Sequence, residues 1–272
     1  MTGKKGTALT KAETAALAAW EGYEGPDGFE GTDKSELAIP FINLLQSNSE
    51  AVEDGDATAG QLWNNVMETA HDELRIVPCA RQKVFVEWVP VDDGGGLVAI
   101  HDPKSEFVQR AIAANDGSTF DMKVADGKHD LVETIYLYVL VLDEDGGWDQ
   151  AVVSFTSTKL KKYRNFFTKA NSQMMSVNGR KFRLPLWAHR YKLSSEQEVS
   201  KSNGKKFQNF VLEFDGETAK DCRYTPDDAI FQAGEAFHDM VTSGVAKADV
   251  SQASNETTSG SDDAAGDDDI PF

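Results

Sequence analysis

The sequence contains little cysteine and no long apolar run. Cys79 and Cys222 are its two cysteines, and neither has the Cys-x-x-Cys or neighbouring histidine spacing of a zinc site. We therefore expect two reduced thiols rather than a disulfide framework. No apolar stretch approaches the roughly 20 residues that span a bilayer, and residues 1–10 lack the apolar segment of a signal peptide. These absences predict a cytoplasmic protein.

The motifs of common enzymes are also missing. The glycines at 94–96 are not followed by Gly-Lys-Ser/Thr, so they do not form a Walker A loop, and Ser154 and Ser157 have no nucleophile-elbow context. Four of the five histidines precede an aspartate: His71, His101, His129 and His238. Histidine and carboxylate ligands suit divalent metals, but the spacing of these pairs is irregular and aspartate is abundant. We expect no catalytic residue, metal or cofactor, and keep a metal-dependent nuclease as the third interpretation.

Positive charge is scarce except in one segment. The chain has 27 Lys and Arg against 45 Asp and Glu, a net charge of −18. Residues 159–206 nevertheless contain thirteen basic and two acidic residues. A strongly acidic chain is repelled by nucleic acid except where a cationic surface faces the phosphates. The charge distribution therefore predicts one focused binding groove rather than general adhesion to duplex DNA.

Aromatic residues alternate with these cations. Cations that follow a phosphate backbone and rings that stack on bases together make a single-strand binding surface. The predicted phosphate contacts are Lys159, Lys161, Lys162, Arg164, Arg180, Lys181, Arg183, Arg190, Lys192, Lys205 and Lys206, and the predicted stacking rings are Trp187, Tyr191, Trp88 and Tyr163. The alternative is a solvated basic face whose aromatics lie in the core. Helical spacing favours the core for Leu160, Phe166 and Phe167.

The chain ends in an acidic tail with an apolar tip. Residues 246–272 are rich in Ser, Thr, Gly and Asp, a composition that predicts disorder. The last six residues are Asp267, Asp268, Asp269, Ile270, Pro271 and Phe272. This tip resembles that of bacterial single-stranded DNA-binding proteins, which recruit replication and repair enzymes through the same hexapeptide. The resemblance implies a partner-binding role for these six residues, and the tail's charge predicts competition with nucleic acid for the basic groove.

A second resemblance covers more of the chain. The runs Ile39 to Ile42, Val84 to Val89 and Ser157 to Lys162 are similar to a family of phage-encoded proteins described as single-stranded DNA-binding. The predicted core is much longer than the compact OB domain of the bacterial family.

The sequence pattern predicts an α+β, mainly β fold with three parts. Residues 1–34 form a flexible arm with a short helix at 12–20, residues 35–245 form the core, and residues 246–272 form the tail. The core is predicted to be an OB-like β-barrel with peripheral helices, because that fold presents a curved strand face to single strands.

Individual elements follow from local patterns. Strands are expected at 74–77 and 83–89, joined as a hairpin through 78–82, and at 97–100. A hairpin is expected from 131–142 and 148–155, and two further strands at 184–193 and 206–214 with the loop 194–204 between them. Helices are expected at 105–114, from 159 onward, and from 225 to about 241.

These observations predict a non-enzymatic single-stranded DNA-binding protein of replication, recombination or repair, encoded by a phage. Its expected partners are single-stranded DNA and, through the tip, replication or repair proteins. The sequence leaves the preference for DNA over RNA and homo-oligomerisation open. The alternative in another class is an adaptor that binds host replication factors.

Overall fold

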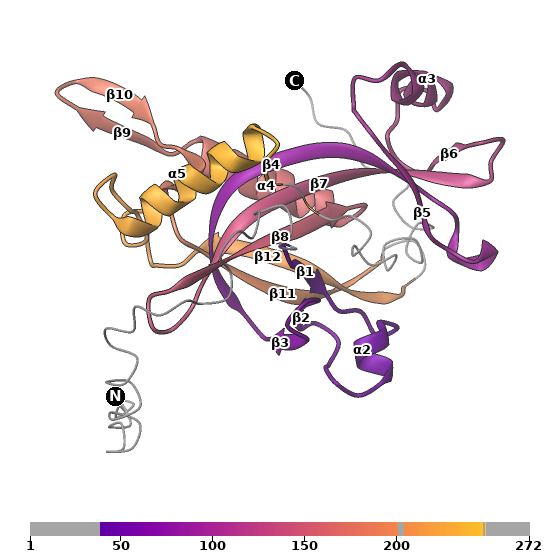
Figure 1. Cartoon of the computed structure of the whole chain (residues 1–272), viewed down its shortest axis with the longest axis horizontal. Helices are drawn as coiled ribbons and strands as arrows, with labels where there is room; N and C mark the ends of the chain where they lie inside the picture. Colours follow the sequence, from indigo (N-terminus) through magenta and orange to yellow (C-terminus); the bar gives the residue numbers. More distant parts are fainter. Residues whose placement is uncertain (1–38, 201–203, 247, 249–272) are drawn as a thin grey trace, which may run out of the picture. The chain divides into compact units, whose positions relative to one another are not determined.

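The computed structural model describes residues 39–200, 204–246 and 248 (Figure 1). The predicted arm at 1–34 with its helix, and the tail from 249 with its tip, lie outside the described residues. Among the helices that are described, none is long and apolar enough to cross a membrane.

The fold is mostly β and is built on one sheet of ten strands that curls into a half-barrel (Figure 1). The strand order is β12-β11-β4-β7-β8-β1-β2-β3, with β5 on β4 and β6 on β7. β1 runs parallel to β8, and the other pairs are antiparallel. The strands of the sheet are β1 (Phe41–Leu44), β2 (Leu62–Asn64), β3 (Thr69–His71), β4 (Leu74–Trp88), β5 (Leu97–His101), β6 (Met122–Val124), β7 (His129–Leu142), β8 (Trp148–Thr156), β11 (Tyr191–Val199) and β12 (Lys206–Phe214).

A separate two-stranded ribbon and four helices complete the described residues. The ribbon consists of β9 (Met174–Val177) and β10 (Arg180–Arg183). The helices are α2 (Glu50–Glu53), α3 (Glu106–Ala114), α4 (Lys159–Asn171) and α5 (Ala229–Thr242), with 3-10 turns at Val91–Asp93 and Leu186–Ala188. The predictions of β5, α3, α4, β12 and α5 are confirmed.

Helices α4 and α5 cover opposite faces of the sheet. On one face, Leu160 and Phe166 of α4 join a core with Leu137 of β7. On the other face, Phe237 of α5 packs against Tyr138 of β7, with ring centroids 6.1 Å apart. Because β7 is covered on both faces, its central residues form a continuous apolar run rather than an alternating one. This explains why its hairpin with β8 was predicted correctly.

The predicted hairpin at 74–89 is wrong, because β4 is one strand of 15 residues. It pairs with β7 from Arg75 opposite Leu142 to Trp88 opposite Asp130. The register shifts between Pro78 and Ala80, and a bulge of this kind accommodates a proline within a strand. The proline therefore marks an irregularity of pairing rather than a turn.

The predicted strand at 184–193 and the loop at 194–204 are also corrected. The segment before β11 contains a 3-10 turn at Leu186–Ala188, and β11 continues to Val199, where it pairs with Lys206 of β12. The polar residues of β11 are therefore strand residues. They lie in the β11–β12 hairpin, which extends beyond the three residue pairs that β11 forms with β4.

Candidate nucleic-acid interface

Helix α4 places apolar side chains inward and lysines outward. Leu160, Tyr163 and Phe166 are buried, whereas Lys161 and Lys169 are exposed. This is the amphipathic arrangement that the spacing predicted. Phe167, which was assigned to the core, is only partly buried.

Three of the four predicted stacking rings lie in the core. Tyr163, Tyr191 and Trp88 are 3%, 2% and 5% exposed. Tyr191 packs between Phe166 and Phe214, with ring centroids 5.0 and 4.8 Å away. A base cannot stack on a ring whose faces are already covered, so the stacking role predicted for these three residues is wrong.

The fourth ring, Trp187, is half-buried and packs on α5. Its centroid lies 4.9 Å from that of His238 and 6.1 Å from that of Phe231. Gly234 allows this approach, because a Cβ atom there would lie 2.8 Å from the Cβ of Trp187. The indole Nε1 is buried without a hydrogen-bond partner in the described part of the chain. Trp187 thus joins the 3-10 turn to α5, and its contacts with His238 and Phe231 make it a packing residue.

Several predicted phosphate contacts are already paired with carboxylates. Lys162 Nζ lies 2.7 Å from Glu196 Oε1 and 2.6 Å from Glu198 Oε1. Burial lowers the pKa of Lys162, but its hydrogen bonds to these two glutamates raise it above its ordinary value. Further pairs join Arg190 to Asp215 at 2.5 Å, Lys192 to Glu73 at 3.9 Å and Arg164 to Glu133 at 3.8 Å. Part of the positive charge of the segment is therefore neutralised locally.

Other cations of the segment are exposed. Lys161, Lys169, Arg180, Lys181, Arg183 and Lys206 form no ion pair within 4.0 Å among residues 39–200, 204–246 and 248. Lys205 is exposed beside Lys206 at the start of β12, and Lys159 lies with its Nζ 5.5 Å from the centroid of the Phe210 ring. The unpaired cations are concentrated on α4 and β10.

The β9–β10 ribbon projects from the sheet (Figure 1), and every one of its strand residues is exposed. Its turn is Asn178-Gly179, both with positive φ (51° and 77°), the combination typical of a tight two-residue hairpin. Asn-Gly between alternating residues is a sequence signal that could have predicted this ribbon. Its register places Phe182 opposite Met175 and Lys181 opposite Ser176. The ribbon therefore presents one largely apolar face and one basic face.

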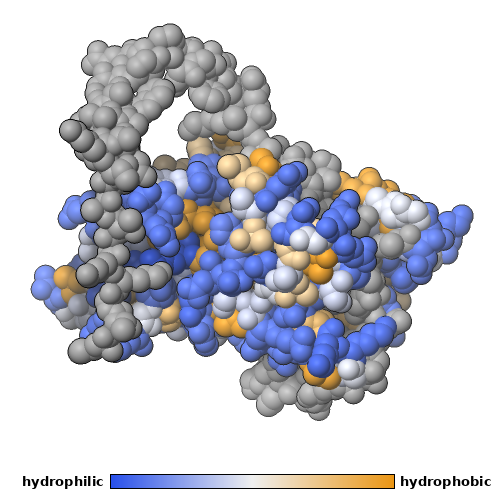
Figure 2. Space-filling model, turned by 90° about the horizontal axis from the view of Figure 1, so that it is seen from below, coloured by the Kyte–Doolittle hydropathy of each residue, from blue (hydrophilic) through white to orange (hydrophobic). Residues whose placement is uncertain are grey.

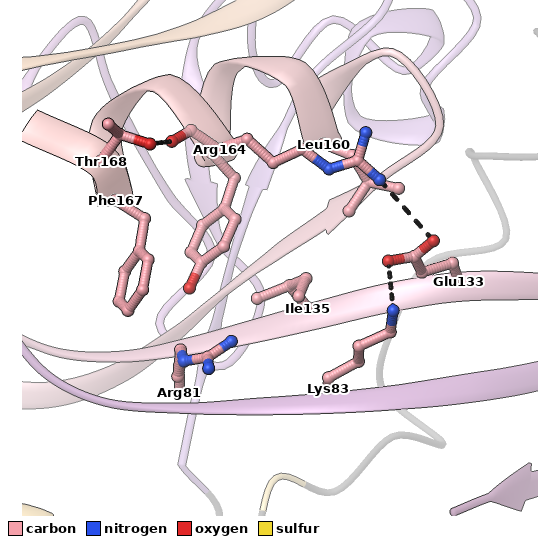
Figure 3. A pocket seen from close by; sticks show the side chains of 9 residues that line it. Arg81, Lys83, Glu133, Ile135, Leu160, Arg164, Phe167 and Thr168 are labelled. Carbon is pink, nitrogen blue, oxygen red and sulfur yellow. Dashed lines mark hydrogen bonds and ion pairs between the residues drawn. The ribbon is translucent and has the colours of Figure 1, made fainter. Parts of the chain in front are cut away.

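A cleft of about 300 Å³ lies beside α4, above the β4–β7 strand pair (Figure 3). Its lining residues are Arg81, Lys83, Glu133, Ile135, Leu160, Tyr163, Arg164, Phe167 and Thr168. Figure 3 shows Lys83 from β4 and Arg164 from α4 reaching the same Glu133 carboxylate, at 2.7 and 3.8 Å. Arg81 lies over the Phe167 ring, with its Cζ 4.7 Å from the centroid. The sequence prediction missed Arg81 and Lys83, because it placed them in or next to a turn.

The sequence matches the family described as Pam3 phage gp34-like protein over residues 4–247. The chain belongs to this family. The family's description supports a phage protein, as the second resemblance suggested. Comparison with curated proteins and with solved structures gave no match.

In this gp34-like chain, two of the four His-Asp pairs meet at one glutamate. His101 Nε2 lies 2.8 Å from Glu87 Oε2, and His129 Nδ1 lies 2.6 Å from Glu87 Oε1. Burial raises the pKa of Glu87, but the hydrogen bonds from His129 and His101 lower it below its ordinary range. Within the described ranges, no three His, Cys, Asp or Glu side chains are grouped as metal ligands. The two histidines thus serve as partners of a buried carboxylate.

Proposed function

We propose that this chain binds single-stranded DNA and catalyses no reaction. The observation that carries the proposal is the group of exposed cations on α4 and β10, which have no ion-pair partner in the part of the chain that the structure describes. In a chain of net charge −18, such cations attract a phosphate backbone locally while the remaining surface repels it.

The arrangement of the sheet also supports the proposal. A curled half-barrel is compatible with an OB-like barrel, the architecture that presents a curved strand face and long loops to single strands. The face shown in Figure 2 is mainly hydrophilic, with hydrophobic residues in separate small groups. Among the described residues, this face therefore offers no large apolar patch to a protein partner.

With three of the predicted stacking rings buried, Phe182 is the best candidate for stacking. Its side chain is 49% exposed and lies on β10 between Lys181 and Arg183. Side chains alternate along a strand, so Phe182 shares its face of the ribbon with Arg180, and a base on this ring would place a neighbouring phosphate near Arg180. The six residues of the C-terminal tip complete the proposal as the segment that recruits replication or repair proteins.

The test is binding of fluorescent oligo(dT), matched duplex and matched RNA, with and without magnesium. If about four to six cations contact phosphates, log K against log salt should have a slope of roughly −3 to −4. Replacing Arg180, Lys181 and Arg183 by Gln should flatten the slope by roughly 2. The matched control replaces Lys104, Arg110 and Lys128, near α3 and β6, and should leave the slope unchanged. A wild-type slope near zero would contradict the proposal, and magnesium-dependent cleavage would favour a nuclease.

The second candidate is a protein-interaction adaptor, favoured by the apolar side chains of the ribbon. Met174, Met175, Val177 and Phe182 are 37–49% exposed. If the adaptor function is correct, Phe182→Ala should abolish partner binding while oligo(dT) shows no salt-dependent binding to any variant.

A further inference from the structure

The cleft beside α4 exists because two helical layers leave part of one sheet face uncovered. On that face of the β4–β7 pair, Leu137 packs under α4, and Phe85 packs under α3. Between these two cores the strand pair presents Arg81 and Lys83. Their side chains point to the same face of the sheet, because side chains two residues apart in a strand lie on the same face. The register sets Arg81 opposite Leu137 and Lys83 opposite Ile135.

The cleft holds more positive than negative charge. Among the residues that the structure describes, its lining cations are Arg81, Lys83 and Arg164, and its only lining carboxylate is Glu133. Burial raises the pKa of Glu133, but hydrogen bonds from Lys83 and Thr119 and the charge of Arg164 lower it below its ordinary value. Glu133 is therefore ionised at neutral pH, and it holds Lys83 and Arg164 at one side of the cleft. Arg81 has no carboxylate partner within 4.0 Å in the described ranges.

Tyr163 contributes a buried hydroxyl to the lining of the cleft, and Arg81 is the cation beside it. Tyr163 is 3% exposed, and its hydroxyl makes no hydrogen bond of ordinary geometry to any described residue. Its ring stacks on Phe167 with centroids 5.6 Å apart, and Arg81 covers Phe167. Burial raises the pKa of Tyr163 to about 12, while the charge of Arg81 and a side-chain contact with it, outside ordinary hydrogen-bond geometry, lower it, so the hydroxyl stays protonated beside Arg81. A buried hydroxyl without a partner costs about 1–3 kcal/mol.

We propose that this cleft is a phosphate-binding pocket in which Arg81 and the Tyr163 hydroxyl donate hydrogen bonds to phosphate oxygens. A cation and a neutral donor directed at one space require an acceptor-rich anion, and guanidinium groups match phosphate geometry. Because the hydroxyl has almost no accessible surface, the ligand reaches it when the exposed Arg81 side chain shifts, a fast motion for a surface residue. The volume, about 300 Å³, lies at the lower end of ligand sites and leaves room for part of a nucleotide beside the phosphate.

Glu133 has a defined effect in this proposal. A phosphate that reaches Lys83 or Arg164 must compete with the Glu133 carboxylate, which lies 2.7 Å from Lys83 Nζ. The glutamate thus orients two cations and also weakens anion binding. The proposal deepens the proposed function and rests on it only for the phosphate's source, which is a phosphodiester of a single strand or a free nucleotide.

In the first experiment, the full chain is titrated with inorganic phosphate and with thymidine 5′-monophosphate, and isothermal titration calorimetry measures the affinity of each. Arg81→Gln should weaken both at least tenfold, because it removes a guanidinium that has no carboxylate partner among the described residues. Arg110→Gln is the matched control, since its side chain is 80% exposed on α3, and it should bind like the wild type. Equal affinities of the two variants, or no binding of either ligand to the wild type, would overturn the proposal.

The second experiment removes single groups at the pocket wall. Tyr163→Phe keeps the ring and deletes only the hydroxyl, so it should raise the melting temperature and weaken phosphate binding severalfold. Glu133→Gln should instead tighten phosphate binding severalfold, because it frees Lys83 and Arg164. A structural role alone predicts changes in melting temperature without these opposite changes in affinity, and that result would refute the pocket.

Oligo(dT) binding by the same variants separates this proposal from the proposed function. Weaker oligo(dT) binding by Arg81→Gln would identify the phosphate as a backbone phosphodiester. Binding of the mononucleotide without any binding of oligo(dT) would leave the pocket standing as a nucleotide site and remove the single-strand function. If oligo(dT) binds tightly, Arg81→Gln does not change that binding, and the mononucleotide does not bind, then the single-strand function stands and the pocket is refuted.

Discussion

Trp187 and Phe182 lie five positions apart in the sequence and have opposite surroundings. Trp187 packs on His238 and Phe231, whereas Phe182 is 49% exposed on β10. Trp187→Ala should lower the free energy of unfolding by about 2–4 kcal/mol, somewhat less than for a fully buried ring, and leave oligo(dT) affinity unchanged. Phe182→Ala should leave stability unchanged and weaken binding by about 1–3 kcal/mol. Urea denaturation and fluorescence anisotropy measure the two quantities, and a loss of DNA affinity in Trp187→Ala would move the interface to α5.

His189 gives the protein a stability that depends on pH. The residue is 2% exposed, and burial, followed by the charge of Arg223, lowers its pKa to about 4. An unfolded histidine titrates near 6.5, so between roughly pH 6.5 and 4 the unfolded state binds more protons and stability falls as the pH falls. The loss should reach about 2–3 kcal/mol near pH 4. His189→Phe keeps a ring but cannot titrate.

The measurement for His189 is the free energy of unfolding at pH 7 and pH 4.5 for both proteins. The wild type should lose more stability over this interval than His189→Phe, whatever the difference between them at pH 7. Equal losses would show that a proton reaches the folded His189 side chain as readily as the unfolded one.

Helix α4 carries two adjacent lysines with different surroundings. Lys161 is exposed without an ion pair in the described ranges, whereas Lys162 joins α4 to Glu196 and Glu198 of β11. Lys161→Gln should reduce the magnitude of the salt slope of oligo(dT) binding by roughly 0.7 and leave the melting temperature unchanged. Lys162→Gln should lower stability by about 1 kcal/mol, because it leaves two carboxylates unpaired, and should change the slope less. Equal slope changes would mean that DNA displaces the glutamates from Lys162.

A helix or strand is predicted well from the sequence where residues close to it along the chain determine its structure. The β7–β8 hairpin has a turn in which Asp143 accepts hydrogen bonds from the backbone of Asp145 and Gly147, and the apolar runs on both sides are readable without the fold. Pro78 misleads because its bulge depends on the register with β7, which no local pattern shows. The second part of β11, residues 194–199, was predicted as a loop for a related reason, since its polar residues are held in the strand by pairing with β12.

At the scale of the molecule, the sequence predicted the charge of the candidate site but not its geometry. The cations of α4 and β10 belong to residues 159–206, whose excess of lysine and arginine is visible in the sequence. The cleft joins Arg81 to Arg164, and their distance in space follows from the β4–β7 register and the docking of α4 on the sheet. Burial of Tyr163 and Tyr191 is likewise decided by tertiary packing, because an aromatic ring among cations suits a core and an interface equally well.

We predict that the acidic C-terminal residues compete with DNA for the cations of the same molecule. Residues 251–272 carry six acidic residues and no lysine or arginine, while α4 and β10 carry exposed cations. Removing residues 267–272 should leave the melting temperature unchanged and should tighten oligo(dT) binding. The gain should be largest at low salt, because the Debye length is about 30 Å at 0.01 M and about 8 Å at 0.15 M. Phe272→Ala keeps every aspartate, so it should retain the full-length DNA affinity and lose the recruited partner. Weaker DNA binding after the truncation would show that these residues belong to the binding surface.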